Sequence, residues 1–416
     1  MEVREASAAY SAVVVAVAVD DAGSGYKRFE VGGIPEDWNI FSSCAIAAKR
    51  SNAIVGGPFG SDLVSKDYVA VGVPVVRGQN MSAHYVSGDF VFVSKSKARQ
   101  LQANLTRPHD IVFTQRGTLG QVALVPSGAY DEYVVSQSQM KLTLNSDLAN
   151  AEYVYQYFMS AQGQKQILES AIQTGVPHTN LSILRSYRVP LPSTKAEQEA
   201  IAEALSDADA LIESLQQLIA KKRQIKQGSM QALLTGKQRL PGFSRAWSAK
   251  RLGEMLTICH GKSQRQVDVA DGRYPILATG GRIGWTNHFL CSKPSVLIGR
   301  KGTIDQPQYM ETPFWTVDTL FFSVVHEPNH AKFLFYRFCL IDWKQYNEAS
   351  GVPSLNAKTI ENIQFSSPEP DEQTAIATIL TDMDTELAEL ETRLAKTRAL
   401  KQGMMQALLT GRIRLV

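Results

Sequence analysis

One long segment, residues 195–236, carries apolar side chains at alternating steps of four and three residues. The six apolar positions are Ile201, Leu205, Ala208, Ile212, Leu215 and Ile219. This spacing places them on one narrow face of an α-helix. Thr194 and Glu197 have capping-box spacing at its start, and Gly236 stands where a C-terminal cap belongs. The pattern predicts a helix of about 40 residues, roughly 60 Å long. A single segment of this kind would equally suit an amphipathic core helix.

The same segment occurs a second time, at residues 371–415. An offset of 175 positions carries the six apolar residues onto Ile376, Leu380, Met383, Leu387, Leu390 and Leu394. The ending KQGSMQALLTG of the first copy matches KQGMMQALLTG of the second. Upstream, the tetrapeptide TGVP at 174–177 corresponds to SGVP at 350–353, and GIPEDW at 33–38 echoes GFSRAW at 242–247. We therefore interpret the chain as a tandem duplication of a variable block followed by a long helix.

Charge predicts how the two helices pair. In each copy acidic residues come first and basic residues last: 197–213 before 221–226, and 371–391 before 393–401. Part of this order only complements the helix dipole. Parallel pairing, however, would place like charges together, whereas antiparallel pairing places opposite charges together. The sequence predicts an antiparallel coiled coil, with the two blocks at its opposite ends and related by a pseudo-twofold axis.

The predicted fold class is α+β, with two mixed blocks separated by two long helices. We place the boundaries as a disordered leader at 1–25, the first block at 26–173, the first long helix with its lead-in at 174–240, the second block at 241–349 and the second long helix at 350–416. The helices repeat closely while the blocks differ in length and sequence, so the helices look like a shared frame that holds two different blocks.

Within the blocks, short β-rich runs bounded by turn residues predict strands, and each block ends in a helix. The expected strands of the first block are 68–76, 90–93, 110–114, 121–125 and 139–144, followed by a helix at 151–171. The expected strands of the second block are 274–278, 295–298 and 319–325, followed by a helix at 329–347.

Composition limits the class of protein. A chain of 416 residues with 44% apolar residues has enough core for two to three domains. The net charge is only +3, so a nucleic-acid surface would have to be local. The four cysteines show no CxxC spacing, which favours a reduced, cytoplasmic compartment without disulfides or structural zinc.

The leader has no counterpart in the repeat. Its apolar stretch, Ala8 to Val19, is shorter than the roughly 20 residues that span a bilayer, and no basic segment precedes it. We expect no membrane association, and a buried edge strand is the alternative to disorder.

Two catalytic motifs are rejected on their context. His326-Glu327-Pro328-Asn329-His330 matches the H-E-x-x-H pattern of zinc proteases, but Pro328 would cost about 3 kcal/mol inside the helix that this chemistry needs. A loop between strand and helix fits better, with Pro328 as the first helical residue. Gly261-Lys262-Ser263 resembles the end of a phosphate-binding loop, but Leu256 replaces the leading Gly. We predict no metal site, no cofactor of its own and no catalysis.

The blocks do offer polar loops suited to DNA. Arg, Gln, Asn and Lys beside strands are the side chains that bond to base edges and phosphates. The candidates are Arg77, Gln79, Asn80, Gln115, Arg116, Thr118 and Gln137 in the first block, and Lys262, Arg265, Arg282, Trp285, Arg300, Lys301 and Thr303 in the second. Any one of them also suits an ordinary polar turn. Arg116-Gly117-Thr118 and Lys301-Gly302-Thr303 follow comparable apolar strands, which indicates one loop kept in both halves, with phosphate positioning as its role.

These residues resemble a known family. The doubled TGVP/SGVP segments, the EQ-x-A-I-A helix starts and the paired KQ-x-x-MQALLTG endings are similar to the specificity subunit of type I restriction–modification enzymes. GPFGSDL, VPVVRGQN and FTQRGTLG in the first block, and GRKGTID and FWTVDT in the second, resemble its recognition domains. The resemblance covers about Tyr26 to Val416.

The resemblance implies a non-catalytic subunit. Each block would be a target recognition domain that reads one half of a split sequence in double-stranded DNA, and the helices would set the spacer and dock the partners. Those partners would be two adenine methyltransferase subunits, which use S-adenosylmethionine, and two restriction–translocase subunits, which use ATP and Mg²⁺. Two alternatives remain open: the recognition subunit of a fused nuclease–methyltransferase system, and a coiled-coil scaffold whose blocks bind proteins.

Overall fold

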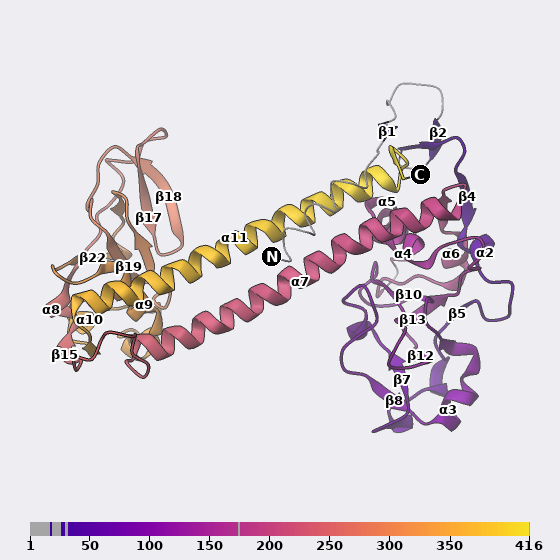
Figure 1. Cartoon of the computed structure of the whole chain (residues 1–416), viewed down its shortest axis with the longest axis horizontal. Coiled ribbons are helices and arrows are strands. Elements are labelled where there is room, and N and C mark those ends of the chain that lie inside the picture. The colour runs from indigo at the N-terminus through magenta and orange to yellow at the C-terminus, as the bar shows by residue number, and fades with distance from the viewer. Residues whose placement is uncertain (1–16, 19–25, 30–31, 174, 416) are drawn as a thin grey trace. The chain divides into compact units, whose positions relative to one another are not determined.

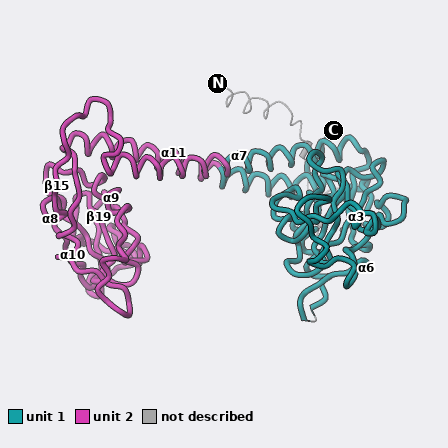
Figure 2. The backbone as a smooth tube through the Cα atoms, turned by 90° about the horizontal axis from the view of Figure 1, so that it is seen from below, with its two compact units in different colours: residues 1–215, 394–416 teal, residues 216–393 magenta. Residues whose placement is uncertain are grey.

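The computed structural model describes residues 17–18, 26–29, 32–173 and 175–415. The chain forms two compact units (Figure 2): unit 1 comprises residues 1–215 and 394–416, and unit 2 comprises residues 216–393. Each unit contains mixed helices and strands together with parts of both long helices, which confirms the predicted α+β class (Figure 1).

Most of the leader lies outside the described residues. The part that is described, β1 (Val17–Ala18), pairs antiparallel with β24 (Ile413–Arg414) near the end of the chain. The expectation of disorder therefore does not hold for these two residues, because the C-terminal strand supplies backbone hydrogen-bond partners.

The block of unit 1 contains two small sheets. One has the order β11 (Val122–Leu124), β10 (Ile111–Thr114), β13 (Gln139–Leu142) and β5 (Ile54–Gly56), all antiparallel. The other has the order β6 (Tyr68–Val69), β8 (Val91–Val93), β7 (Val73–Val76), β12 (Tyr133–Val135) and β9 (Leu105–Thr106). Strand β10 is buried at all four positions, and its first three residues, IVF, are apolar without the alternation of a half-exposed strand.

Helices and a small strand pair complete unit 1. They are α2 (Ser43–Ile46), α3 (Lys95–Gln100), α4 (Ala151–Met159), α5 (Ala161–Glu169), α6 (Leu181–Ser186) and the pair of β4 (Asn39–Ser42) with β14 (Arg188–Leu191). A short hairpin of β2 (Tyr26–Phe29) and β3 (Gly32–Pro35) precedes them. Trp38, Tyr153 and Phe158 are fully buried in the core that these elements share.

Unit 2 repeats the plan with fewer strands. Its main sheet has the order β16 (Leu256–Cys259), β22 (Leu320–Val325), β19 (Ser295–Gly299) and β20 (Gln308–Met310). Its second sheet has the order β18 (Gly281–Thr286), β17 (Tyr274–Ala278) and β21 (Trp315–Thr316). The other elements are α8 (Leu252–Met255), α9 (Ala331–Leu340), α10 (Ala357–Glu361) and the pair of β15 (Ser248–Arg251) with β23 (Gln364–Ser367).

Helix α7 (Lys195–Leu234) has nearly the predicted extent, whereas α11 (Pro370–Leu408) ends before the end of the predicted segment 371–415, and strand β24 follows it. At the start of α7 the backbone N–H of Glu197 donates to Thr194 Oγ1 at 3.2 Å, as a capping residue requires. At its end Gly236 has a positive φ of 72°, the left-handed conformation in which glycine carries no steric cost.

The helices pair antiparallel within each unit, which confirms the charge argument. In unit 1, Lys401 near the end of α11 lies 2.5 Å from Asp209 near the start of α7. In unit 2, Lys226 near the end of α7 pairs with Asp384 near the start of α11. These two ion pairs occupy equivalent positions of the repeat, 175 residues apart.

The predicted seam is buried most deeply where it meets a block. Ile201 and Leu205 belong to the core of unit 1, and Ile376 and Leu380 to the core of unit 2. Leu215, Ile219 and Leu387 are also buried. Ile212, Met383, Leu390 and Leu394 are half-buried.

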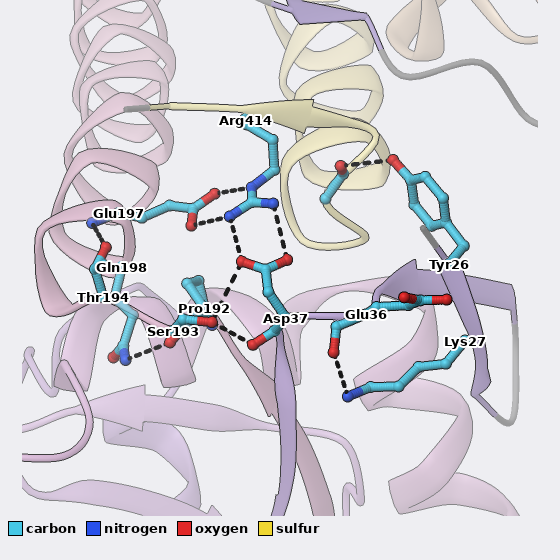
Figure 3. A network of polar contacts seen from close by, with 11 residues as sticks. Tyr26, Lys27, Glu36, Asp37, Pro192, Ser193, Thr194, Glu197, Gln198 and Arg414 are labelled. Carbon is cyan, nitrogen blue, oxygen red and sulfur yellow. Dashed lines mark hydrogen bonds and ion pairs between the residues drawn. The ribbon is translucent and has the colours of Figure 1, made fainter. Parts of the chain in front are cut away.

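A polar network ties each block to both helices, and its central contacts recur in both units. In unit 1, Arg414 pairs with Glu197 (Figure 3). Its guanidinium carbon lies 5.8 Å from the Trp38 ring centroid. In unit 2, Arg239 lies 2.7 Å from Glu372, and its guanidinium carbon lies 5.6 Å from the Trp247 ring centroid. Trp247 also donates to Glu372 at 3.0 Å, a bond that the buried Trp38 Nε1 does not make. The shared arginine–glutamate pair and arginine–tryptophan contact support the duplication.

Three expected elements are interrupted. The strand predicted at 68–76 breaks at 70–72, where a Cβ on Gly72 would lie 2.0 Å from the Val93 carbonyl oxygen. The helix predicted at 151–171 breaks at Ser160, whose hydroxyl donates to the Tyr157 carbonyl and accepts from the Gly163 N–H. The capping serine therefore starts a new helix in the middle of an apolar pattern.

The helix predicted at 329–347 ends at Leu340, and a short 3₁₀ turn follows at Trp343–Tyr346. His330 caps this helix, so Pro328 lies before it and is not its first residue as predicted. The prediction that His326 and His330 belong to a loop between strand and helix is confirmed for His326, and His330 stands at the boundary.

Candidate nucleic-acid interface

In unit 1 the loop after β10 is fixed by two other segments. The backbone N–H of Gln115 donates to the Ser138 carbonyl at 2.7 Å, and that of Arg116 donates to the same oxygen at 3.3 Å. From the other side the Thr179 N–H donates to the Gln115 carbonyl at 2.9 Å. Arg116 also forms a β-bridge with His178, which follows the GVP sequence. The loop therefore lies between the turn before β13 and the GVP segment.

Unit 2 makes the same contacts with different residues. The N–H groups of Arg300 and Lys301 donate to the Thr319 carbonyl at 2.8 and 3.2 Å, and the Leu355 N–H donates to the Arg300 carbonyl at 2.9 Å. Lys301 forms a β-bridge with Ser354, which again follows GVP. The prediction that the Arg116 and Lys301 loops are one loop kept in both halves is confirmed in structure, while its role stays a prediction.

A third loop joins this junction through a close backbone approach. A Cβ on Gly57 would lie 1.8 Å from the Ser136 carbonyl oxygen, and a Cβ on Gly261 would lie 2.0 Å from the Val317 carbonyl oxygen. Only glycine allows chains to approach this closely. The loops that begin at Gly57 and Gly261 are therefore equivalent, and each unit brings three loops and one GVP segment together.

The predicted DNA-binding residues differ in exposure. Those that are exposed are Gln79, Arg116, Thr118, Gln137, Lys262, Arg265, Arg282, Trp285 and Lys301. Those that are half-buried are Arg77, Gln115, Arg300 and Thr303. Arg282 and Trp285 lie on β18 and not in the three loops, and the guanidinium of Arg282 lies 4.5 Å from the Trp285 ring centroid.

Asn80 does not fit its predicted role as a base reader. It is 1% exposed, its Oδ1 accepts from the Arg77 backbone N–H at 3.1 Å, and its Nδ2 donates to the carbonyls of Ser87 and Asp89 at 3.0 Å. Both ends of its amide are engaged inside the protein. Asn80 positions the loop after β7 and has no free amide group with which to contact DNA.

Gln137 also has a local task. Its amide Nε2 donates to the carbonyls of Gly60 at 2.5 Å and Leu63 at 3.1 Å, so it holds the loop after β5. This loop carries Phe59, which is 91% exposed. Sequence reasoning missed Phe59, although a phenylalanine within Gly-Pro-Phe-Gly, a turn-forming sequence, was a signal that could have identified it.

A polar depression of about 390 Å³ lies at this place in unit 1. Its lining residues are Gly60, Leu63, Val64, Ser65, Tyr68, Arg77, Ser136, Gln137 and Ser138. Two predicted residues, Arg77 and Gln137, are thus brought together at one concave surface. No acidic side chain lines it, so an electron-rich group such as a base edge or phosphate would meet no repulsion there.

A cluster of charged residues joins the loop after β7 to the long helices in unit 1. His84 Nε2 lies 2.7 Å from Glu152 of α4, and its Nδ1 lies 3.5 Å from Asp209 of α7. Burial opposes a charge on His84, but hydrogen bonds with Asp209 and Glu152 outweigh it and raise the pKa of His84. Burial likewise opposes the Asp209 carboxylate, yet His84, Lys401 and Gln156 together lower its pKa to about 2.

Within the described residues, no group of three or more His, Cys, Asp and Glu side chains is placed to hold a metal ion. All four cysteines are free. No helix in the described part of the chain is both long and apolar enough to cross a membrane.

The chain is similar to known proteins along most of its length. A family model described as type I restriction modification DNA specificity domain matches residues 63–223 and 244–397, once in each repeat. The type I restriction enzyme MjaVIII specificity subunit of Methanocaldococcus jannaschii is 24% identical over 355 residues, which cover 74% of this chain and 80% of that protein. The putative MjaX specificity subunit of the same organism is 24% identical over 425 residues, which cover 94% of this chain and 96% of that protein.

A solved structure shows the same fold. The S subunit of a type I restriction–modification system from M. genitalium matches with a TM-score of 0.64 at 18% identity, over 92% of this chain and 98% of that one. At this identity the likeness supports the fold alone. Because the family model matches both repeats and covers most of the sequence, the chain belongs to the type I restriction–modification DNA specificity family and is a specificity subunit.

Proposed function

We propose that each unit reads one half of a bipartite sequence in double-stranded DNA. The observation that carries this proposal is the equivalent loop junction in both units. The backbone hydrogen bond between Gln115 and Ser138 in unit 1 corresponds to the one between Arg300 and Thr319 in unit 2. The side chains that the two junctions present differ. A common frame with different side chains is what two readers of different sequences require.

Within this junction, Arg116 and Lys301 are the proposed phosphate contacts. Both are exposed, both follow a buried strand, and both keep a positive charge at equivalent positions. A phosphate contact positions the protein on any sequence, so it is expected in both readers. The base contacts are expected among the residues that differ between the units.

The long helices are the proposed spacer between the half-sites and the docking surface for partners. Helix α7 runs unbroken for 40 residues and α11 for 39, and each contributes residues to both units. A helix of 40 residues is about 60 Å long, which exceeds one duplex turn of about 34 Å. Bases between the half-sites would then not be read.

The partners in this proposal are two adenine methyltransferase subunits and two restriction–translocase subunits. S-adenosylmethionine, ATP and Mg²⁺ would act on those subunits, and this chain would supply sequence choice without catalysis. The relatives named above as type I specificity subunits support this assignment.

Selection of bound duplexes from a random pool tests the proposal. The chain, assembled with the methyltransferase subunit of its own system, is expected to enrich a motif of two short parts separated by a gap of fixed length and free sequence. Enrichment of one continuous motif would contradict the two-reader proposal, and enrichment of no motif would contradict DNA specificity altogether.

A further inference from the structure

Arg77 has an unusual position for a charged side chain. Its backbone is fixed, because its N–H donates to Asn80 Oδ1 at 3.1 Å and its carbonyl accepts from the Asn80 N–H at 2.8 Å. Its Nε is buried, yet it finds no hydrogen-bond partner among the described residues. A buried donor without an acceptor is destabilising, so this guanidinium is prepared for a partner that the chain does not supply.

The partner must accept hydrogen bonds from the planar set of N–H donors of a guanidinium. Carboxylates, phosphates and the O6/N7 edge of guanine accept two parallel hydrogen bonds from arginine. Arg77 lines the depression of about 390 Å³ described above, together with the hydroxyl side chains of Ser65, Ser136 and Ser138. The partner therefore enters from solvent, through a polar and concave surface.

The backbone at the rim of this depression is held by hydrogen bonds. Gln137 holds the carbonyls of Gly60 and Leu63, and the Asp62 N–H donates to the Phe59 carbonyl at 3.0 Å. The Phe59 side chain, next to the lining residue Gly60, is 91% exposed. An exposed aromatic side chain beside a polar depression gives the flat face of a base an apolar surface to contact.

Arg77 has no counterpart in unit 2. Strand β7 pairs parallel with β12, Val76 opposite Val135, and the equivalent strand β17 pairs parallel with β21, Leu277 opposite Thr316. The next residue after Val76 is Arg77, and the next residue after Leu277 is Ala278. The hydrogen bonds that follow also agree, because the Ser136 N–H donates to the Val76 carbonyl and the Val317 N–H to the Leu277 carbonyl, both at 3.0 Å.

This difference separates a base contact from a phosphate contact. Phosphate positioning is independent of sequence and is expected in both units, as with Arg116 and Lys301. A base reader is expected to differ, as Arg77 and Ala278 do. We propose that the depression beside Phe59 receives the edge of a guanine in the first half-site and that Arg77, through its guanidinium, determines that base. This inference rests on the proposed function.

Duplex selection with the assembled methyltransferase complex tests it, using the wild-type chain, Arg77→Lys, Arg77→Ala and the control Arg99→Ala. Arg99 is exposed on α3 of the same unit, so its loss removes the same charge elsewhere. Wild type and Arg99→Ala are expected to select the same G·C pair in one half of the motif. Arg77→Ala is expected to accept any pair there. Arg77→Lys is expected to keep a reduced preference for G·C, because lysine also donates to guanine O6 and N7, and both variants are expected to bind the wild-type motif about 10- to 100-fold more weakly.

A second measurement identifies the atoms. Replacing that guanine by 7-deazaguanine removes N7, and it is expected to weaken wild-type binding but not the binding of Arg77→Ala. If the wild-type complex selects a bipartite motif and Arg77→Ala still selects the wild-type base, this inference is overturned and the proposed function stands. Uniform weakening on all sequences with a lower salt slope shows a phosphate contact and also overturns it. A wild-type complex that selects no motif overturns the proposed function and this inference together.

Discussion

Arg414 binds Glu197 across 217 positions of sequence, with Nη2 2.8 Å from Oε2 and Nε bonded to Oε1. The Glu197 side chain is 2% exposed, so the pair joins the end of the chain to the start of α7 at a buried site. Arg414 also donates to both oxygens of Asp37, and its pKa is raised above its usual value by the hydrogen bond with Glu197 first and the one with Asp37 next (Figure 3). The end of the chain is thus part of the first unit.

Replacing Arg414 by Ala is expected to destabilise unit 1. The change leaves the Glu197 carboxylate buried without its ion-pair partner, which costs about 3 to 5 kcal/mol for a fully buried pair and less here, because Arg414 is partly exposed. Thermal unfolding measures the effect. The neighbouring exposed Arg412 is the matched control, and Arg412→Ala is expected to change the midpoint little. Equal midpoints for the two variants would show that the pair contributes nothing.

His84 predicts a pH dependence of stability. Its pKa is raised in the folded state. Its contribution to the free energy of unfolding is therefore fully present below about pH 6.5 and is lost as pH rises through the folded pKa. The stability advantage of wild type over His84→Asn is therefore expected to be larger at about pH 6 than at about pH 9. Urea unfolding of both proteins at the two pH values measures it. A constant or inverted difference would exclude His84 as the titrating group.

Replacing Gly57 or Gly261 by alanine is expected to disturb the proposed recognition loops of unit 1 or unit 2, respectively. Gly57→Ala would place a Cβ 1.8 Å from the Ser136 carbonyl oxygen and push the loop after β5 away, whereas Gly261→Ala would do so against Val317 at 2.0 Å. Each variant is expected to lose sequence preference in one half of the motif only, measured by duplex selection. Gly228 in α7 has open space around its Cβ position, so Gly228→Ala is the control, and we expect it to add about 1 kcal/mol of helix stability. Loss of both half-sites from either loop variant would argue against separate readers.

Arg116 and Lys301 are expected to contact phosphate. Arg116→Ala and Lys301→Ala should each weaken binding on all sequences to a similar degree and reduce the slope of log affinity against log salt by about one. Binding titrations over a range of salt concentrations give both quantities. A changed sequence preference at constant salt slope would instead identify the residue as a base reader.

The sequence alone was sufficient to predict the long helices and their direction. Their apolar spacing is local, and their charge order is repeated, so two separate signals agreed. It was insufficient where a local cap overrode periodicity: Ser160 divides α4 from α5 because its hydroxyl bonds to Tyr157 and Gly163, although the apolar pattern continues.

The candidate site was predicted as a set of residue types but not as an arrangement. Asn80 and Gln137 have the chemistry of base readers, yet both amides bond to backbone carbonyls that only the folded loops bring near. The junction of Arg116 with His178, and of Lys301 with Ser354, depends on segments over fifty residues apart. Such pairings follow from the folded chain and not from sequence spacing.

The assignment of one half-site to each unit is tested most directly by mapping the methylated adenines in DNA modified by the reconstituted methyltransferase complex. The wild-type complex is expected to methylate a motif of two parts separated by a fixed unread gap. Replacing the loop residues Lys262, Ser263, Gln264 and Arg265 by alanine is expected to change only one part of that motif and to leave the other part and the gap as they were. A change in both parts, or methylation at a motif without a gap, would contradict the assignment of one reader to each unit.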